Sequence, residues 1–132
     1  NNQRKKKILI VSANYYKNIS KDLRKSSYKS LLKAKVKVDE INVPGVFEIP
    51  VIITKCIKKY DGFLALGCVI KGETPHFDFI SKTTIDAIMK LSIENKKPIG
   101  NGIITCLNQK QALARKNKGK EAAEAVLSVL KA

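Results

Sequence analysis

Disulfides, a membrane span and a secretory signal all find little support in this sequence. Its three cysteines, Cys56, Cys68 and Cys106, lie inside apolar segments without a paired spacing. They indicate buried thiols in a reducing compartment rather than a disulfide framework or a metal site. The longest apolar runs, such as VFEIPVII, fall far short of the roughly 20 residues of a membrane-spanning helix. The run ILIV near the amino terminus is too short for the apolar part of a secretory signal. We therefore expect a cytoplasmic protein with no membrane partner.

Acidic residues are also scarce: 11 aspartates and glutamates stand against 26 lysines and arginines, which gives a net charge of +15. Such a charge attracts polyanions, so nucleic acid has to be considered as a partner. The lysines, however, are spread along every segment, and aromatic residues do not alternate with them as in single-strand binders. We interpret the charge as a solvated, lysine-rich surface that also attracts phosphorylated metabolites, and we expect no nucleic-acid partner.

Segments patterned as strands alternate with segments patterned as helices. The chain has 132 residues, the length of one domain, and we expect 1–132 to form a single domain with 1–7 as a flexible basic leader. Four apolar or β-branched runs predict strands: KILIVSA, KVKVDEINV, DGFLALGCVI and PIGNGIITC. The first helix is expected to begin with Asn18 or Ser20 as its N-cap. This alternation predicts an α/β fold with a parallel sheet covered by helices on both faces.

One segment, GVFEIPVIITKCIKKY, fits two structures on pattern alone. Its Val/Ile run is typical of a strand, whereas a helix that begins near Val46 would place Pro50 in its first turns, where a missing N–H costs little. In parallel α/β sheets, ligands bind beyond the carboxyl ends of the strands. That edge receives the segments SANYY, VPGVFE and KGETPH, which follow the first three strands.

The single histidine of the chain, His76, stands in the last of these segments. Thr74 is expected to cap a helix whose first residue is Pro75, which leaves unpaired N–H groups that suit a phosphate. The same helix end disfavours a protonated imidazole, so His76 in the first turn would be a mostly neutral ring able to exchange protons near pH 7. On pattern alone, a structural histidine explains this position as well as a catalytic one does.

Three further residues also have both a functional and a structural interpretation. Glu48 could contact a substrate, or its carboxylate could simply be stabilised by the dipole of the helix that it begins. Tyr15 and Tyr16, at the end of the first strand, could stack on a flat ligand or cover the core.

Four motifs together resemble the lumazine synthase family of riboflavin biosynthesis: VPGVFEIP, LGCVIKGETPHFDFI, NGIITCLNQKQALAR and NKGKEAAEAVL. The resemblance runs in order from about Ile8 to Leu130. It implies a flavodoxin-like three-layer α/β/α sandwich around a four-stranded parallel sheet. It also implies a transferase without cofactor or metal. The substrates are 5-amino-6-(D-ribitylamino)uracil and 3,4-dihydroxy-2-butanone 4-phosphate, and the products are 6,7-dimethyl-8-ribityllumazine, phosphate and water. The resemblance favours a helix after Gly45 and a catalytic His76.

For the pyrimidine substrate, the resemblance implies contacts from residues that follow the first three strands. Tyr15 takes the place of an aromatic residue that stacks on the ring. Other positions hold the ribityl chain or contact the ring through the backbone: Val46, Phe47 and Glu48 in the first role, Val69 and Ile70 in the second.

For the phosphate substrate, the resemblance implies a binding turn formed by Gly72, Glu73 and Thr74, with His76 as the proton-transfer residue. Three later positions complete the site: Asn101 as the residue that a neighbouring subunit places over the heterocycle, Arg115 as the phosphate clamp, and Lys118 as a lysine nearby. Arg115 suits this role because its planar fork can bind two oxygens. The implied assembly is a homopentamer, or a shell of pentamers, with shared active sites and riboflavin synthase as a further partner.

The sequence departs from the family pattern in three places. Tyr15 and Tyr16 replace a usual Phe-Asn pair, Lys71 stands where arginine is common, and the link between Arg115 and Lys118 is short. Two other classes of function compete with the enzyme: a basic nucleic-acid-binding module with the same fold, and a protein that stores flavin-like heterocycles. The joint presence of Glu48, His76 and Arg115 favours the enzyme.

Overall fold

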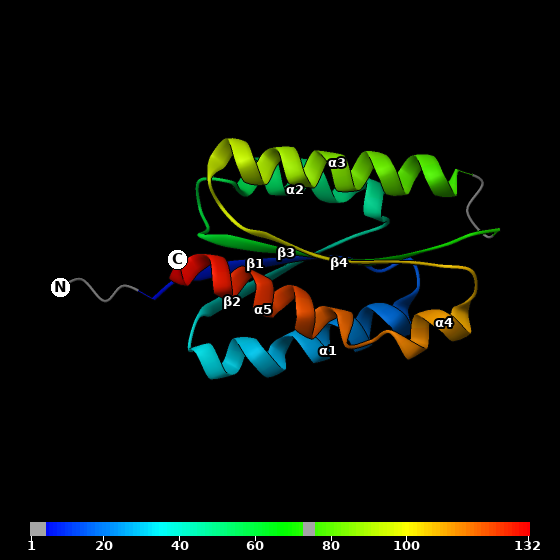
Figure 1. Ribbon diagram of the computed structural model, residues 1–132, viewed down its shortest axis with the longest axis horizontal. Coiled ribbons are helices and arrows are strands. Elements are labelled where there is room, and N and C mark those ends of the chain that lie inside the picture. Colours follow the sequence, from blue (N-terminus) through cyan, green and yellow to red (C-terminus); the bar gives the residue numbers. More distant parts are fainter. Residues whose placement is uncertain (1–4, 73–75) are drawn as a thin grey trace.

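Four parallel strands form the central layer of the computed structural model, which describes residues 5–72 and 76–132 (Figure 1). Their order across the sheet is β2-β1-β3-β4. The four strands are β1 (Lys7–Ala13), β2 (Lys37–Val43), β3 (Gly62–Ile70) and β4 (Ile99–Cys106). All three pairings between neighbouring strands are parallel, as the alternation of strand and helix patterns predicts.

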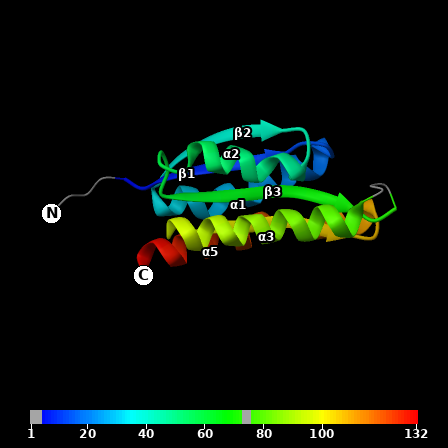
Figure 2. The same ribbon diagram turned by 90° about the horizontal axis from the view of Figure 1, so that it is seen from above.

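Helices cover both faces of this sheet (Figures 1 and 2). One layer contains α1 (Lys17–Ala34), α4 (Gln109–Ala114) and α5 (Lys118–Lys131). The opposite layer contains the 3-10 helix η1 (Val46–Glu48), α2 (Ile49–Cys56) and α3 (Phe77–Asn95). The predicted three-layer α/β/α sandwich around a four-stranded parallel sheet is therefore confirmed.

The core is divided in two by the sheet, because successive side chains of a strand point to opposite faces. In β1, Ile8 and Ile10 pack towards α1 and α5, whereas Leu9 and Val11 pack towards α2. All nine residues of β3 are buried. The three cysteines, all within the described ranges, form no disulfide, and Cys68 and Cys106 are buried. Within the described part of the chain, no helix combines the length and apolar character that a bilayer span requires.

The segment GVFEIPVIITKCIKKY, whose pattern fitted either a strand or a helix, forms the helices η1 and α2, with Pro50 as the second residue of α2. The predicted start of the first helix was wrong, because α1 begins at Lys17, with Tyr16 and not Asn18 or Ser20 at the N-cap position. The Ser20 hydroxyl cannot cap the helix, since it is buried and lies 2.7 Å from the Ser12 hydroxyl, with which it is hydrogen-bonded. The ring of Tyr16 packs against the core.

The sheet begins within the segment expected to be a basic leader. Lys7 is the first residue of β1, and its N–H donates a hydrogen bond of 2.8 Å to Asp61 Oδ2. The carbonyl oxygen of Lys6 accepts from the N–H of Lys37 at 2.9 Å. Residues 1–4 lie outside the described residues.

Helices α1 and α5 pack against each other, and Gly119 lies at their contact. A Cβ atom at this position would lie 2.0 Å from the carbonyl oxygen of Leu23 and 2.5 Å from Ser26 Oγ. The Ser26 hydroxyl is itself held by the carbonyl oxygens of Leu23, at 3.0 Å, and of Lys116, at 2.6 Å. Only glycine therefore fits between the two helices without a shift of their backbones.

Replacing Gly119 with alanine should lower the free energy of unfolding by about 1–3 kcal/mol, as overpacking typically does. Helix propensity alone would change stability in the opposite direction, by about 1 kcal/mol in favour of alanine. Denaturant unfolding of Gly119→Ala and of a control, Ser128→Ala on the exposed face of α5, measures the difference. The control should stay within about 0.5 kcal/mol of the parent. A Gly119→Ala protein more stable than the parent would show that the helices can separate at no cost.

Candidate active site

The carboxyl ends of the strands carry most of the predicted site residues. β3 and β4 extend further at this edge than their neighbours: pairing of β1 with β3 ends at Ser12 and Leu66, whereas pairing of β3 with β4 continues to Ile70 and Cys106. Beyond Leu66, the edge of β3 that faces β1 has no strand partner in the described part of the chain. Backbone N–H and C=O groups of residues 67–70 on that side can therefore hydrogen-bond a ligand.

This free edge bears on two apolar residues that were predicted to contact a substrate through their backbone. The side chains of Val69 and Ile70 are buried, at 3% and 0% exposure. Backbone groups of successive strand residues point to opposite edges, and the N–H groups of Phe63 and Lys71 donate to the β4 side. The free edge therefore presents the backbone groups of Ile70, whereas those of Val69 face β4.

The segment after β2 can lie close to β3 because Gly67 of β3 has no side chain. Val46 is buried, and a Cβ atom at Gly67 would lie 2.6 Å from Val46 Cγ1 and 3.1 Å from Ala13 Cβ. Because Gly67 has no side chain, η1 can pack against β1, β3 and α3 at once. Gly67 was not among the predicted site residues, although an isolated glycine in a strand pattern indicates a close approach of this kind.

Glu48 ends η1 and turns back onto the start of that helix. Its Oε1 atom accepts a hydrogen bond of 3.0 Å from the N–H of Gly45. Among the described residues, no donor occupies the other carboxylate oxygen, Oε2. The structural interpretation of Glu48 and the functional one are therefore compatible, since one oxygen orients the carboxylate and the other can accept a ligand hydroxyl.

Two aromatic side chains lie exposed near this edge. Tyr15 is 69% exposed in the connection between β1 and α1, and Phe47 is 54% exposed in η1. The ring of Tyr15 meets the ring of Tyr16 edge to face, with centroids 4.8 Å apart and an interplanar angle of 87°. Tyr16 thus supports the ring of Tyr15 and leaves a face open for stacking.

His76 directly precedes α3. The predicted helix start at Pro75 was wrong, because α3 begins at Phe77 and His76 occupies the N-cap position with a non-helical backbone (φ −115°, ψ 41°). Its side chain is exposed, and its carbonyl oxygen accepts from the N–H of Ile80 at 2.8 Å. Gly72 lies in the turn after β3. Glu73, Thr74 and Pro75 lie outside the described residues, so the expected phosphate-binding turn is described only at Gly72.

Arg115 is anchored to the end of β4. Its Nη1 atom donates a hydrogen bond of 3.2 Å to the carbonyl oxygen of Thr105, which pairs with Val69 in the sheet. Burial raises the pKa of the neighbouring Cys106 thiol, and the positive charge of Arg115 partly opposes this shift. Lys118, three residues later, is the first residue of α5, and its N–H donates to the carbonyl oxygen of Arg115 at 3.0 Å. The anchoring role of Thr105 has no signal in the sequence.

Asn101 lies apart from the other site residues. It pairs with Ala65 in the first half of β4, four residues before Thr105, and its side chain is exposed. Its Oδ1 atom accepts a hydrogen bond of 3.0 Å from the N–H of Ile103. A single chain therefore does not bring Asn101 to the edge at which Glu48 and His76 lie.

The site residues form two groups on different layers of the sandwich. Glu48 and His76 belong to the layer of η1 and α3, whereas Arg115 and Lys118 belong to the layer of α4 and α5. Within the described residues, no hydrogen bond or ion pair joins the two groups. Nor do any three His, Cys, Asp or Glu side chains of the described residues gather as a metal site requires.

Comparison with known proteins relates the whole chain to one family. The family model for 6,7-dimethyl-8-ribityllumazine synthase matches residues 5–132. A protein of that name from Bartonella tribocorum is 43% identical over 136 residues, which cover 97% of this chain and 90% of the relative. Relatives of the same name from Bartonella bacilliformis and Agrobacterium fabrum are 45% and 41% identical. Their alignments cover 93% of this chain in each case, and 87% and 91% of the relatives.

These relatives match nearly their full length, and the matched range includes every element of the sandwich from β1 to α5. The chain belongs to the 6,7-dimethyl-8-ribityllumazine synthase family.

Proposed function

We propose that this chain catalyses the condensation of 5-amino-6-(D-ribitylamino)uracil with 3,4-dihydroxy-2-butanone 4-phosphate in riboflavin biosynthesis, as a single lumazine synthase domain. Its membership of the synthase family carries this proposal. The chain retains the groups that the condensation needs: an aromatic platform, a free strand edge, a proton carrier and an arginine beside the strand ends.

The pyrimidine substrate binds beyond the carboxyl end of β1. Its flat ring stacks on Tyr15 and receives backbone hydrogen bonds from the free edge of β3 at Ile70, with Val69 beside it in the floor of the site. Its ribityl chain runs along Val46 and Phe47, and the free Oε2 atom of Glu48 accepts a hydrogen bond from one of its hydroxyls. The arrangement is supported by the exposure of Tyr15 and by the orientation of Glu48 through Gly45.

The phosphate substrate binds between Gly72 of one chain and the guanidinium group of Arg115 from a neighbouring chain. Glu73 and Thr74, which lie outside the described residues, are further residues that we propose for the phosphate, and Lys118 adds positive charge near it. The fork of an arginine binds two phosphate oxygens at once, and the Thr105 carbonyl oxygen restricts the orientation of that fork.

His76 transfers protons between the two substrates. The pyrimidine amine attacks the ketone carbon, and loss of one water leaves an imine. The phosphate then leaves, the ribitylamino nitrogen attacks the remaining carbonyl carbon, and loss of a second water closes the second ring. Each of these steps moves a proton to or from nitrogen or oxygen. An exposed imidazole next to the phosphate turn can accept the proton in one step and return it in another.

Each active site is shared by two adjacent subunits of a homopentamer. Glu48 and His76 come from one chain, and Asn101, Arg115 and Lys118 come from its neighbour. This arrangement is supported by the position of the two groups on different layers of one chain. It is also supported by exposed apolar side chains on the η1, α2 and α3 layer that another copy would cover: Phe47, Val51, Phe79, Met89 and Ile93. A cytoplasmic location suits the three thiols, and riboflavin synthase, which would use the product, is a further partner.

Removing the imidazole should slow the reaction without unfolding the protein. His76→Ala should reduce turnover by roughly ten- to a thousandfold, because a general acid–base typically contributes about 10²–10⁴-fold and the uncatalysed condensation limits the loss. Lumazine absorbance with both substrates present measures this rate. Lys90→Ala, an exposed change on the same helix, is the control and should keep the parent rate. Unchanged turnover in His76→Ala would remove this residue from the mechanism.

Truncation of Arg115 should weaken the binding of one substrate more than that of the other. Arg115→Ala should weaken binding of the butanone phosphate by about 1.5–3 kcal/mol, the value of a charged hydrogen bond, and affect the pyrimidine much less. Titration of each substrate alone gives both affinities. Lys116→Ala removes the same charge from the adjacent exposed residue and should change neither affinity. Equal losses for the two substrates would contradict the proposed role of Arg115.

Mixing two inactive variants should restore activity if the pocket is shared. When His76→Ala and Arg115→Ala chains are unfolded together and reassembled in equal amounts, about one interface in four should combine both wild-type residues. The mixture should then exceed either parent in turnover, whereas each variant reassembled alone should not. Co-assembled mixtures that stay as inactive as their parents would place both residues in a single-chain site.

A further inference from the structure

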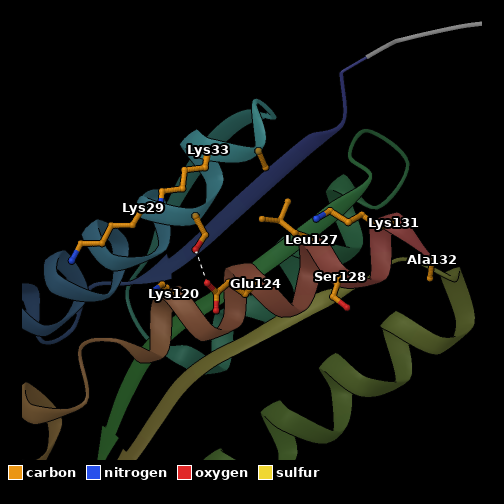
Figure 3. A pocket seen from close by; sticks show the side chains of 10 residues that line it. Lys29, Lys33, Lys120, Glu124, Leu127, Ser128, Lys131 and Ala132 are labelled. Carbon is orange, nitrogen blue, oxygen red and sulfur yellow. Dashed lines mark hydrogen bonds between the residues drawn. The ribbon is translucent and has the colours of Figure 1, made fainter.

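A basic cleft lies between α1 and α5, away from the proposed active site. Its volume is about 710 Å³, and its walls carry four lysines: Lys29 and Lys33 from α1, and Lys120 and Lys131 from α5 (Figure 3). The remaining lining residues include one acid, Glu124, together with serines, alanines and Leu127. Since α1 begins at the carboxyl edge of the sheet, its last turns, which carry Lys29 and Lys33, lie towards the opposite edge.

The lysines that sequence analysis described as spread out are gathered here by helix geometry. Lysine recurs every four residues along α1, and the last three of these positions, Lys25, Lys29 and Lys33, are exposed. Residues four apart lie on neighbouring positions of one helix face, about 6 Å apart along the axis. Lys29 and Lys33 follow the side of α1 that meets α5, because Ser30 between them donates a hydrogen bond of 3.2 Å to Glu124 Oε2.

The four ammonium groups of the cleft lack acidic partners in the described part of the chain. None of the four lysines takes part in the ion pairs of Arg24 with Glu40 or of Lys82 with Asp86, and none donates a hydrogen bond to a described residue. Glu124 is the one acidic side chain that lines the cleft, and its Oε2 atom accepts a hydrogen bond from Ser30. Like charges at four-residue spacing are mildly destabilising, so an anion with several charges in this cleft would relieve their repulsion.

We propose that this cleft binds a linear oligophosphate. Several phosphate groups in a row can contact lysines on both walls, whereas a single phosphate cannot reach all four. Lysine suits this ligand because its ammonium group is a mobile point charge that does not require a fixed geometry. The lining residues include no aromatic side chain on which a base could stack, and this favours an inorganic chain over a nucleotide.

Calorimetric titration with inorganic tripolyphosphate at low ionic strength tests the proposal. Binding should occur and should weaken as salt is added, because exposed charges are screened. Lys29→Gln/Lys33→Gln should reduce affinity by roughly two- to thirtyfold, from the range measured for exposed ion pairs. Glu124→Gln should have the opposite effect, since it removes a carboxylate from the cleft. These substitutions leave every residue proposed for the condensation in place.

A matched control is offered by a second lysine-lined cavity, of about 470 Å³, which includes Lys58 and Lys59. Lys58→Gln/Lys59→Gln lowers the net charge by the same amount and should leave affinity within about twofold of the parent if binding is local. Equal losses in the two double variants would overturn the proposal in favour of general charge attraction, as would the absence of binding by the parent. ATP should bind no more tightly than tripolyphosphate, and clearly tighter binding of ATP would overturn the assignment to an inorganic chain.

Discussion

Burial of the central strand is the constraint on which the rest of the structure depends. All nine residues of β3 are buried, so its side chains require a helical layer on each face of the sheet. The proposed active site lies where the strands end, and there β3 continues past its last pairing with β1 at Leu66. The same apolar strand that holds the core together thus presents the free backbone groups that we assign to the pyrimidine.

The sheet that organises the core also separates the polar residues of the site. Glu48 and His76 lie with the layer of η1 and α3, and Arg115 lies with the layer of α4. In the shared site that we propose, a second copy of the chain supplies the second group. This requirement connects the proposed mechanism to the proposed assembly, since an isolated subunit would have half of two pockets and no complete one.

The two outer layers have different surfaces, which suits different surroundings. α1 carries six basic residues and one acidic residue, whereas α3 carries two basic and three acidic residues and exposes Phe79, Met89 and Ile93. An almost neutral surface with apolar side chains suits contact between identical chains, because like charges would oppose it. A strongly basic surface suits solvent and anions. The cleft between α1 and α5 therefore belongs to the face that an assembly through α3 would leave accessible.

The sequence by itself determined the four strands, the parallel sheet and the family, because apolar runs and short motifs are local properties that survive without knowledge of contacts. It also placed Glu48 and His76 at the correct edge. The tertiary structure decided what depends on contacts between distant segments: the start of α3 after His76, the distance of Asn101 from that edge, and the hydrogen bond from Arg115 to Thr105. It likewise decided that four of the spread lysines meet at the cleft between α1 and α5, since the packing of α5 against α1 brings their positive charges together.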